Sequence, residues 1–190
     1  MQSSELDNFV ALAQQGRPDG LEWIMRQYSS RLYGYFLRST GCMHEAEDLL
    51  SELWVRLLRT LGNYSHSGRF DQWLFRIAAN LVRDRIRRKV SHGVTVSLDS
   101  SKDGEKTFDT ADDHQAEPID IMKSGEARQA VQAALAKLDE KTREMILLRH
   151  FGEMSFAELA KEFDCPVGTV LARVHRGMQK LRQLLEGYES

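Results

Sequence analysis

The chain has 190 residues with 26 basic and 28 acidic side chains, and hydrophobic residues make up 42% of it, which excludes an intrinsically disordered chain. Its two cysteines, Cys42 and Cys165, lie too far apart in sequence for a disulfide scaffold and suit a reducing cytoplasm. No apolar run reaches the ~18–20 residues that span a bilayer, and the N-terminus lacks a basic segment followed by an apolar core, so neither membrane insertion nor a secretory signal is expected. With 13 glycines and 3 prolines, the sequence predicts a soluble, mostly α-helical protein.

Charge divides the chain into three segments. Residues 1–92 carry 13 basic and 10 acidic side chains, residues 93–125 carry 3 and 8, and residues 126–190 carry 10 of each. The middle segment is also poor in apolar residues, so it cannot bury enough surface to offset the entropy lost on ordering. We therefore predict an all-α protein with two small helical domains, 1–92 and 126–190, joined by a flexible acidic linker at 93–125.

The first domain is predicted to contain three amphipathic helices, at 19–39, 43–61 and 70–88. Gly41 and Gly62 mark the ends of the first two. Apolar residues recur at helical spacing on one side of each helix, so the three should bury one another as a small bundle.

The helix at 43–61 has an acidic polar side near its N-terminus, formed by Glu45, Glu47, Asp48 and Glu52. Such a patch interacts favourably with the helix dipole, an effect worth tenths of a kcal/mol up to about 1 kcal/mol. It would also suit a docking surface for a basic or polar partner, and composition leaves both interpretations open.

A polar loop at 62–69 precedes the third helix, which carries much of the basic charge of the first domain. Seven basic residues and two acids lie between Arg69 and Lys89. Phe70 and Trp73 stand at the start of this basic track, and aromatic faces beside cations are typical of sites that bind single-stranded nucleic acid. The alternatives are that the two aromatic residues belong to the core and that the basic side chains form a solvated helix face.

The second domain is predicted to contain four helical segments. Asp139 can cap the second of them, and Ser155 with Glu158 forms a capping box that opens the third. A turn ending in Pro166 then leads into the last and longest helix, because proline is favoured in a first helical turn.

The third and fourth segments have the spacing of a helix-turn-helix, from about Phe156 to His175. A small residue, a turn residue and an apolar residue follow at the intervals that the motif needs, and they are Ala160, Asp164 and Val170. The side chains predicted to face inward are Leu159, Phe163, Val167, Val170 and Val174, and those predicted to face outward are Thr169, Ala172, Arg173 and Arg176. Hydroxyl and guanidinium donors on the outward side fit base and phosphate contacts in a major groove. An αα-hairpin with no role in DNA binding is the alternative.

Four strings carry a family resemblance. They are AEDLLSELWVR at 46–56, FDQWLFRIAAN at 70–80, LVRDRIRR at 81–88, and CPVGTV at 165–170 followed by Arg173, His175 and Arg176. Together they resemble the extracytoplasmic-function group of bacterial sigma factors, the two-domain members of the sigma-70 family. The resemblance covers residues 20–90 and 127–185.

The resemblance implies that the helix at 43–61 binds core RNA polymerase on the clamp helices of β′, with the β flap as a further contact, and that two other surfaces bind promoter DNA. The implied polymerase-core-binding residues are Asp48, Leu49, Glu52, Leu53 and Arg56. Those implied for recognition and melting of the minus-10 element are Tyr64, Arg69, Phe70, Trp73, Asn80, Arg83, Asp84, Arg87 and Arg88. Those implied for the minus-35 element are Ser155, Thr169, Ala172, Arg173 and Arg176.

The implied function is that of an alternative sigma factor, which directs polymerase to specific promoters and is held in check by an anti-sigma factor. It implies no catalytic residue, no metal, no cofactor and no membrane insertion, and it places the protein in the bacterial cytoplasm, at the nucleoid when in holoenzyme. The alternative is a helix-turn-helix repressor or activator that acts without the polymerase core, which would not explain the string at 70–88. An enzyme is disfavoured because the histidines and acids lack metal-ligand spacing and no nucleophile motif is present.

The recognition helix departs from the family pattern at one point. The family commonly continues Arg-Ser-Arg after position 170, whereas this chain has Leu171, Ala172 and Arg173. A bidentate guanine contact from position 171 is thereby lost, so minus-35 recognition is expected to differ. His44 near Cys42 is interpreted as a coincidence rather than a metal site, and Cys165 as a packing residue rather than a redox switch.

Overall fold

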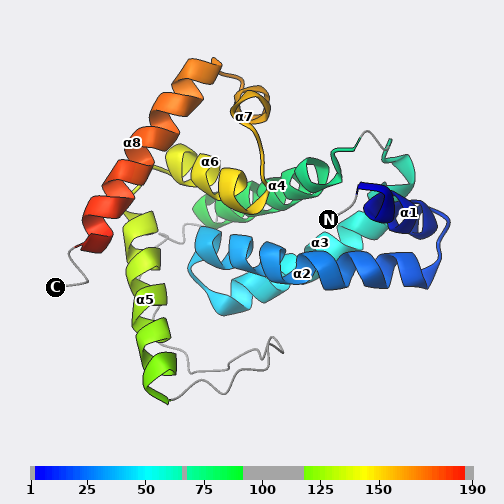
Figure 1. Ribbon diagram of the computed structural model, residues 1–190, viewed down its shortest axis with the longest axis horizontal. Coiled ribbons are helices and arrows are strands. Elements are labelled where there is room, and N and C mark those ends of the chain that lie inside the picture. Colours follow the sequence, from blue (N-terminus) through cyan, green and yellow to red (C-terminus); the bar gives the residue numbers. More distant parts are fainter. Residues whose placement is uncertain (1–2, 66–67, 92–117, 187–190) are drawn as a thin grey trace. The chain divides into compact units, whose positions relative to one another are not determined.

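The computed structural model describes residues 3–65, 68–91 and 118–186, and these residues form helices and no strand (Figure 1). In chain order the elements are α1 (Ser3–Gln14), α2 (Pro18–Thr40), α3 (Met43–Thr60), the 3-10 helix η1 (Leu61–Asn63), α4 (Phe70–Ser91), α5 (Pro118–Ala136), α6 (Glu140–Phe151), α7 (Phe156–Glu162) and α8 (Val167–Glu186). The prediction of an all-α fold is confirmed. None of the helices among the described residues is long and apolar enough to cross a membrane.

The chain forms two compact units. The first unit comprises Met1–Val96 with His150–Met154, and the second comprises Ser97–Arg149 with Ser155–Ser190. The linker predicted at 93–125 lies outside the described residues as far as residue 117. Its last part belongs to α5, so a helix begins before residue 126, where the charge pattern placed the start of the second domain.

The helices predicted in the first domain are present as α2, α3 and α4, and α1 precedes them as a helix that the apolar pattern did not indicate. Pro18 stands in the first turn of α2, where its missing N–H costs no hydrogen bond. The same helix ends at Gly41, whose φ of 73° is left-handed and whose N–H donates to the carbonyl oxygen of Leu37 at 2.8 Å. Glycine adopts that conformation without steric cost, which is why the helix stops there.

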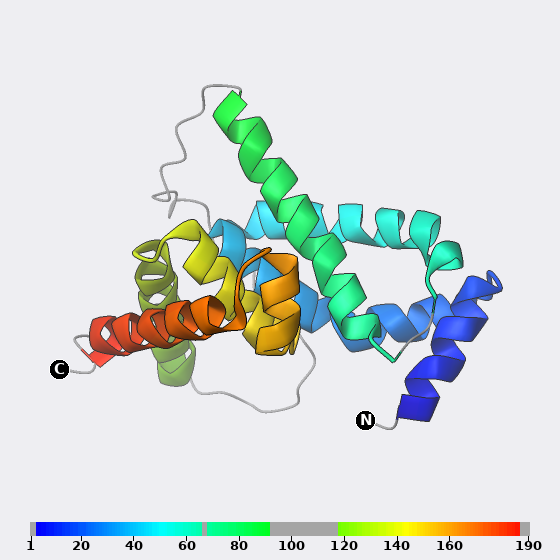
Figure 2. The same ribbon diagram turned by 90° about the horizontal axis from the view of Figure 1, so that it is seen from above.

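The apolar sides of α2, α3 and α4 pack against one another, with α4 crossing the other two (Figure 2). The side chains that this packing removes from solvent include Ile24, Leu32, Phe36, Leu49, Leu53, Leu57, Leu74 and Phe75. Full burial of one such side chain stabilises a fold by roughly 1.5–3 kcal/mol. The predicted bundle is confirmed, and its core positions the polar sides of α3 and α4.

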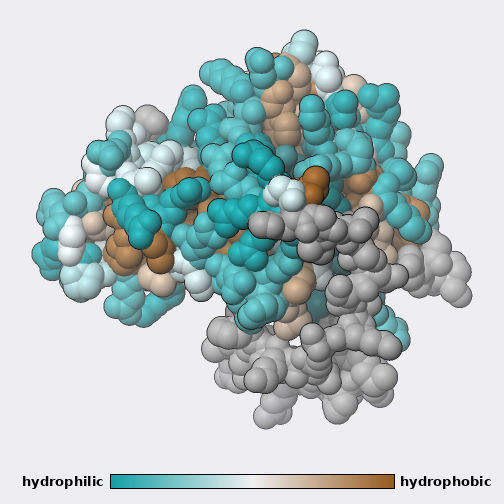
Figure 3. Space-filling view, turned by 180° about the vertical axis from the view of Figure 1, so that it is seen from behind, coloured by the Kyte–Doolittle hydropathy of each residue, from teal (hydrophilic) through white to brown (hydrophobic). Residues whose placement is uncertain are grey.

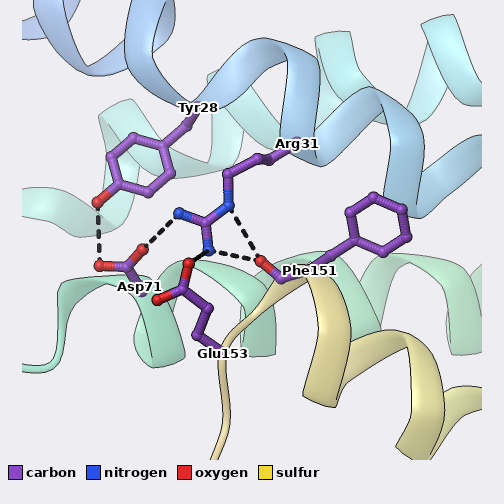
Figure 4. Close-up of polar contacts among 5 residues, drawn as sticks. All are labelled: Tyr28, Arg31, Asp71, Phe151 and Glu153. Atoms are coloured by element: carbon purple, nitrogen blue, oxygen red, sulfur yellow. Dashed lines mark hydrogen bonds and ion pairs between the residues drawn. The ribbon is translucent and has the colours of Figure 1, made fainter.

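Arg31 of α2 joins the end of α6 to α2 and α4 within the first unit (Figure 4). Its Nε and Nη2 donate to the carbonyl oxygen of Phe151 at 3.1 and 2.6 Å, and its Nη1 donates to Asp71 Oδ1 at 3.0 Å. Asp71 Oδ2 accepts a hydrogen bond from the Tyr28 hydroxyl at 3.1 Å, and Glu153 Oε1 lies 3.3 Å from Arg31 Nη2. Burial, and then the charge of Asp71, raises the pKa of Tyr28 well above its ordinary value, so its hydroxyl remains a donor.

The predicted helix-turn-helix is formed by α7 and α8 in the second unit. Ser155 Oγ accepts from the Glu158 N–H at 3.2 Å while Glu158 Oε2 accepts from the Ser155 N–H at 2.8 Å, which completes the predicted capping box. The turn passes through Asp164 with a φ of 46°, a left-handed conformation that aspartate tolerates better than most residues.

The inward side of the helix-turn-helix agrees with the prediction at three of its five positions, and Phe163 is only partly buried. Leu159, Val170 and Val174 are buried, as expected. Val167 is 46% exposed, so its predicted inward orientation is wrong. As the first residue of α8 it shares a helix side with Leu171, one turn later and 50% exposed, rather than with Val170.

Candidate functional site

The acidic side of α3 faces basic residues of α4. Asp48 Oδ2 lies 3.7 Å from Arg85 Nη1, and Glu45 forms an ion pair with Lys89. In a third pair α4 supplies the acid and α3 the base, because Asp84 Oδ2 of α4 lies 4.0 Å from Arg56 Nη1 of α3. Much of the acidic patch is thus explained by pairing between two helices, which neither interpretation from the sequence considered.

The outward side of α3 combines acidic, polar and apolar side chains. Its exposed members are Glu47, Asp48, Ser51, Val55 and Leu58, and we call this set the α3 face. Val55 and Leu58 are 48% and 59% exposed, although large aliphatic side chains tend to be buried. Neither was among the predicted binding residues, and their helical spacing from Asp48 and Ser51 was the available signal.

Other predicted polymerase-binding residues are placed differently. Leu49 and Leu53 are fully buried in the core of the first unit, so they support the α3 face from beneath and offer no surface. Glu52 is partly exposed, and Arg56 is exposed beside its partner Asp84. On the side seen in Figure 3 the described surface is mostly hydrophilic, with separate hydrophobic areas.

The aromatic residues predicted to contact minus-10 DNA form a cluster with one another. Phe70 is fully buried and Tyr64 is 8% exposed, so neither presents its ring to a ligand; here the core interpretation of Phe70 holds. The Tyr64 ring lies 4.5 Å from that of Trp73 and 5.5 Å from that of Phe70. Trp73 keeps part of its surface exposed and is the member of the cluster that a ligand could reach.

One side of α4 presents polar and basic side chains at intervals of three and four residues. These are Arg76, Asn80, Arg83 and Arg87, which we call the α4 stripe. Arg83 Nη1 donates to Asn80 Oδ1 at 3.0 Å, which orients the amide. Arg76 was not among the predicted site residues, although its distance of one helical turn from Asn80 indicates the same side.

The remaining predicted residues flank the α4 stripe. Arg69 and Arg88 are exposed at either end of the helix. Asp84 is partly buried and lies 3.4 Å from Arg87 Nη1, so its carboxylate balances charge within the helix. The stripe therefore offers cations and an amide in a line, as a nucleic-acid backbone requires.

On α8, Thr169, Ala172 and Arg176 are exposed as predicted, whereas Arg173 is only partly so. Arg173 Nη1 donates to Asp139 Oδ1 at 3.3 Å, and Arg176 Nε donates to the carbonyl oxygen of Ala172 at 3.2 Å. Hydrogen bonding with Thr142, and to a smaller degree the charge of Arg173, lowers the pKa of Asp139, so this carboxylate stays ionised.

Ser155, predicted to contact the minus-35 element, already uses its hydroxyl within the fold. The Ser155 hydroxyl is engaged in the cap of α7, so a contact from it to DNA would compete with that cap.

Cys42 and Cys165 are free thiols with partly exposed side chains. Within the part of the chain that the structure describes, no three His, Cys, Asp or Glu side chains come close enough together to hold a metal ion.

Both units match models of known protein families. Sigma-70 region 2 matches residues 24–91, and Sigma-70 region 4 matches residues 128–181. The first match contains the α3 face and the α4 stripe, and the second contains the helix-turn-helix. The segment before residue 24, which includes α1, lies outside both matches.

Several curated proteins are similar over most of the chain. The ECF RNA polymerase sigma factor SigW of Bacillus subtilis is 31% identical over 176 residues, covering 93% of this chain and 94% of that protein. The ECF RNA polymerase sigma factor SigE of Mycolicibacterium smegmatis is 30% identical over 182 residues, covering 96% of this chain and 68% of that protein.

Among solved structures, CnrH in complex with the cytosolic domain of CnrY is 25% identical with a TM-score of 0.62, covering 94% of this chain and 96% of that one. The sigma factor RpoE of Bartonella quintana, in complex with the anti-sigma factor NepR, shares the fold with a TM-score of 0.63 at 19% identity, covering 87% of this chain and 96% of that one.

Proposed function

The chain belongs to the extracytoplasmic-function group of the sigma-70 family of RNA polymerase sigma factors, which confirms the resemblance, and from this premise we propose which of its surfaces bind polymerase and which bind promoter DNA. A sigma factor is a transcription initiation factor that joins core polymerase and directs it to specific promoters. We propose that residues 1–92 bind the core and the minus-10 element, that residues 126–190 bind the minus-35 element, and that 93–125 link them. Bond formation in RNA would belong to the polymerase, and this chain would supply no catalytic group.

We propose that the α3 face docks on the clamp helices of the β′ subunit. The observation that carries this proposal is the exposure of Val55 and Leu58, at 48% and 59%, beside the acidic Glu47 and Asp48. Apolar side chains ringed by charge are typical of protein interfaces, where the apolar part supplies affinity and the rim supplies orientation. The Asp48 side chain is 48% exposed and lies 3.7 Å from Arg85, and surface ion pairs are worth only about 0–1 kcal/mol, so a partner can replace this one.

We propose that the α4 stripe and the loop at 62–69 bind the minus-10 element. Arg76, Arg83 and Arg87 would neutralise phosphates, and the Asn80 amide would hydrogen-bond a base or sugar. The cluster of Tyr64, Phe70 and Trp73 supports the loop, and Trp73 offers the partly exposed ring against which a base could stack.

We propose that the N-terminal half of α8 enters the major groove of the minus-35 element. Thr169, Ala172 and Arg176 are exposed there, and Arg173 would leave Asp139 to reach DNA. With Leu171 half-exposed on the same helix, apolar contact with thymine methyl groups would replace a bidentate contact with guanine.

We further propose that the chain acts in the bacterial cytoplasm, at the nucleoid when in holoenzyme, and that an anti-sigma factor regulates it. The support for a regulator is that a structural relative, the sigma factor RpoE, was solved with an anti-sigma factor bound. Co-purification of a tagged chain that returned polymerase alone under every growth condition would count against such a regulator.

The experiment that tests the division of roles is transcription by purified bacterial core polymerase on a library of upstream DNA, combined with core-binding measurements. Asp48→Arg and Val55→Asp should each weaken core binding more than about tenfold, because they place charge at a docking surface. Glu22→Arg makes a matched charge reversal on an exposed part of α2 and should change it less than about twofold, since exposed surface pairs contribute little.

The minus-35 assignment needs a separate variant. Arg173→Ala should leave core binding unchanged and cost on the order of 1–3 kcal/mol of promoter discrimination. Duplex binding without polymerase, together with no new transcription starts, would instead favour a repressor or activator. If the α3 and α8 variants fail in the same step, the proposed division between the two domains is wrong.

A further inference from the structure

α1 is fixed to the first unit by close packing on α2. The rings of Phe9 and Trp23 stack with centroids 4.5 Å apart and an interplanar angle of 9°, and Val10 is 1% exposed. At Gly20 of α2 a side chain could not be accommodated, because a Cβ there would lie 2.7 Å from the carbonyl oxygen of Phe9. The backbones of the two helices thus approach closely, and the end of α1 has a defined position.

The last residue of α1 reaches from this position to the loop that follows α3. Gln14 Nε2 donates to the carbonyl oxygen of Leu61 at 3.0 Å and to that of Tyr64 at 2.7 Å. A glutamine amide has two N–H donors, so both are used on carbonyl groups of one short turn. Leu61 also accepts from the Tyr64 N–H at 3.0 Å, so its carbonyl oxygen receives two donors.

The turn held by Gln14 decides where the loop at 62–69 begins. A 3-10 turn of three residues is weak by itself, since its hydrogen-bond geometry is poorer than that of an α-helix. The bond to Tyr64 fixes the backbone of the residue whose ring packs between Phe70 and Trp73. Those two rings belong to the first turn of α4, so the Gln14 amide connects α1 with the turn after α3 and, through the Tyr64 ring, with the start of α4.

We propose that Gln14 is a positioning residue for minus-10 recognition, which holds the turn at 61–64 in the conformation that accepts promoter DNA. The inference rests on the proposed function of this loop and of the α4 stripe. It gives α1, which lies outside the matched family region, a role in promoter recognition rather than only in stability. The side chain of Gln14 is exposed and contributes little to the core, so its effect passes through the two carbonyl groups that it binds.

The test variant is Gln14→Glu, which keeps the length and shape of the side chain but presents only acceptors to the two carbonyl oxygens. Gln15→Glu is the matched control, because it makes the same charge change at the neighbouring exposed position. Gln14→Lys is the rescue variant, since an ammonium group can donate to both carbonyl groups. Holoenzyme carrying each variant is titrated with a fluorescent single-stranded minus-10 oligonucleotide, whose sequence comes from mapped start sites.

Gln14→Glu should weaken oligonucleotide binding by roughly tenfold, the loss expected when two net hydrogen bonds are removed, while core binding matches that of Gln15→Glu. Gln14→Lys should restore binding to within about threefold of the unsubstituted chain. Hydrogen exchange of the free chain should show a faster Tyr64 amide in Gln14→Glu alone, which a general loss of stability would not produce.

Asn80→Ala separates failure of this inference from failure of the proposed function, because it alters the α4 stripe and leaves Gln14 in place. If Asn80→Ala weakens oligonucleotide binding and Gln14→Glu does not, the positioning role is overturned and the site stands. If Asn80→Ala and Gln14→Glu both bind the oligonucleotide as the unsubstituted chain does, the minus-10 assignment fails and the inference fails with it.

Discussion

Substitution of Gly177 by alanine tests how closely α8 packs on α6. Gly177 is buried, and a Cβ at this position would lie 2.6 Å from Thr142 Cγ2 and 2.7 Å from Ile146 Cδ1. These separations are far shorter than the roughly 3.5–4.0 Å at which carbon atoms pack. Because α8 carries the proposed minus-35 contacts, the position of the recognition helix depends on this glycine.

The net effect is the difference of two opposing contributions. Alanine in a helix interior is favoured over glycine by roughly 0.5–1 kcal/mol. Forcing a methyl group into a filled core costs roughly 1–3 kcal/mol. Ile146 can move the end of its side chain, but Thr142 is 5% exposed and its N–H donates to Asp139 at 3.1 Å, so the helix start cannot yield freely. We therefore expect Gly177→Ala to lower the free energy of unfolding by about 1–2 kcal/mol.

Gly168→Ala is the matched control, because a Cβ at position 168 of the same helix would meet no atom within 4 Å. It should be neutral or stabilising by up to about 1 kcal/mol. Urea unfolding of the whole chain, followed by far-UV circular dichroism, measures both. With an m-value of about 2 kcal/mol/M, a loss of about 1–2 kcal/mol moves the midpoint by about 0.5–1 M.

Tryptophan fluorescence supplies an internal reference in the same experiment. All 3 tryptophans lie in residues 1–92, so their signal follows the first unit and not the helices that contact Gly177. A Gly177→Ala chain as stable as Gly168→Ala would refute the reasoning. It would mean that the packing between α6 and α8 adjusts at no cost.

Three further predictions concern single contacts. Ser155→Ala should destabilise the second unit by about 1 kcal/mol through loss of the α7 cap, measured by urea unfolding, and an unchanged midpoint would contradict it. The raised pKa of Tyr28 means that the folded chain keeps a proton that the unfolded chain loses above about pH 10, so stability should fall there by up to about 1.4 kcal/mol per pH unit. In thermal melts between pH 8 and 11, Tyr28→Phe should remove this contribution to the fall of stability with pH. If stability falls equally steeply in Tyr28→Phe and in the unsubstituted chain, Tyr28 is not the cause of the fall. Asp139→Asn keeps a capping side chain but removes the charge beside Arg173. Its binding to a minus-35 duplex, measured by fluorescence anisotropy, should therefore strengthen about two- to threefold at low salt and less at high salt. Weaker binding at both salt concentrations would count against this prediction.

The sequence was sufficient where a local pattern determines the structure. The helix from Met43 to Thr60 follows from apolar spacing, and the α7 cap follows from Ser155 and Glu158, three residues apart. Both signals lie within one turn or one helix, so no knowledge of other elements is needed. Arg76 was left out of the predicted minus-10 residues, although its helical spacing from Asn80 was a signal of the same local kind.

What the sequence could not supply are contacts that depend on how two elements meet. Asp48 and Arg85 are separated by most of two helices, and only the crossing of α3 and α4 brings their charges to 3.7 Å. The sequence therefore offered a dipole effect and a partner surface as explanations of the acidic patch, and it did not indicate the ion pairs with the neighbouring helix. The hydrogen bonds to the carbonyl groups of Leu61 and Tyr64 were even less predictable from the sequence. Every residue has a backbone carbonyl group, so side-chain identity does not indicate which carbonyl groups will accept a side-chain donor. Gln14 is an unremarkable glutamine in any pattern, and its importance arises only because Gly20 lets α1 approach α2 closely enough for one amide to reach both. Residues of this kind are found by asking which donor satisfies a given loop carbonyl, a question that requires the fold first.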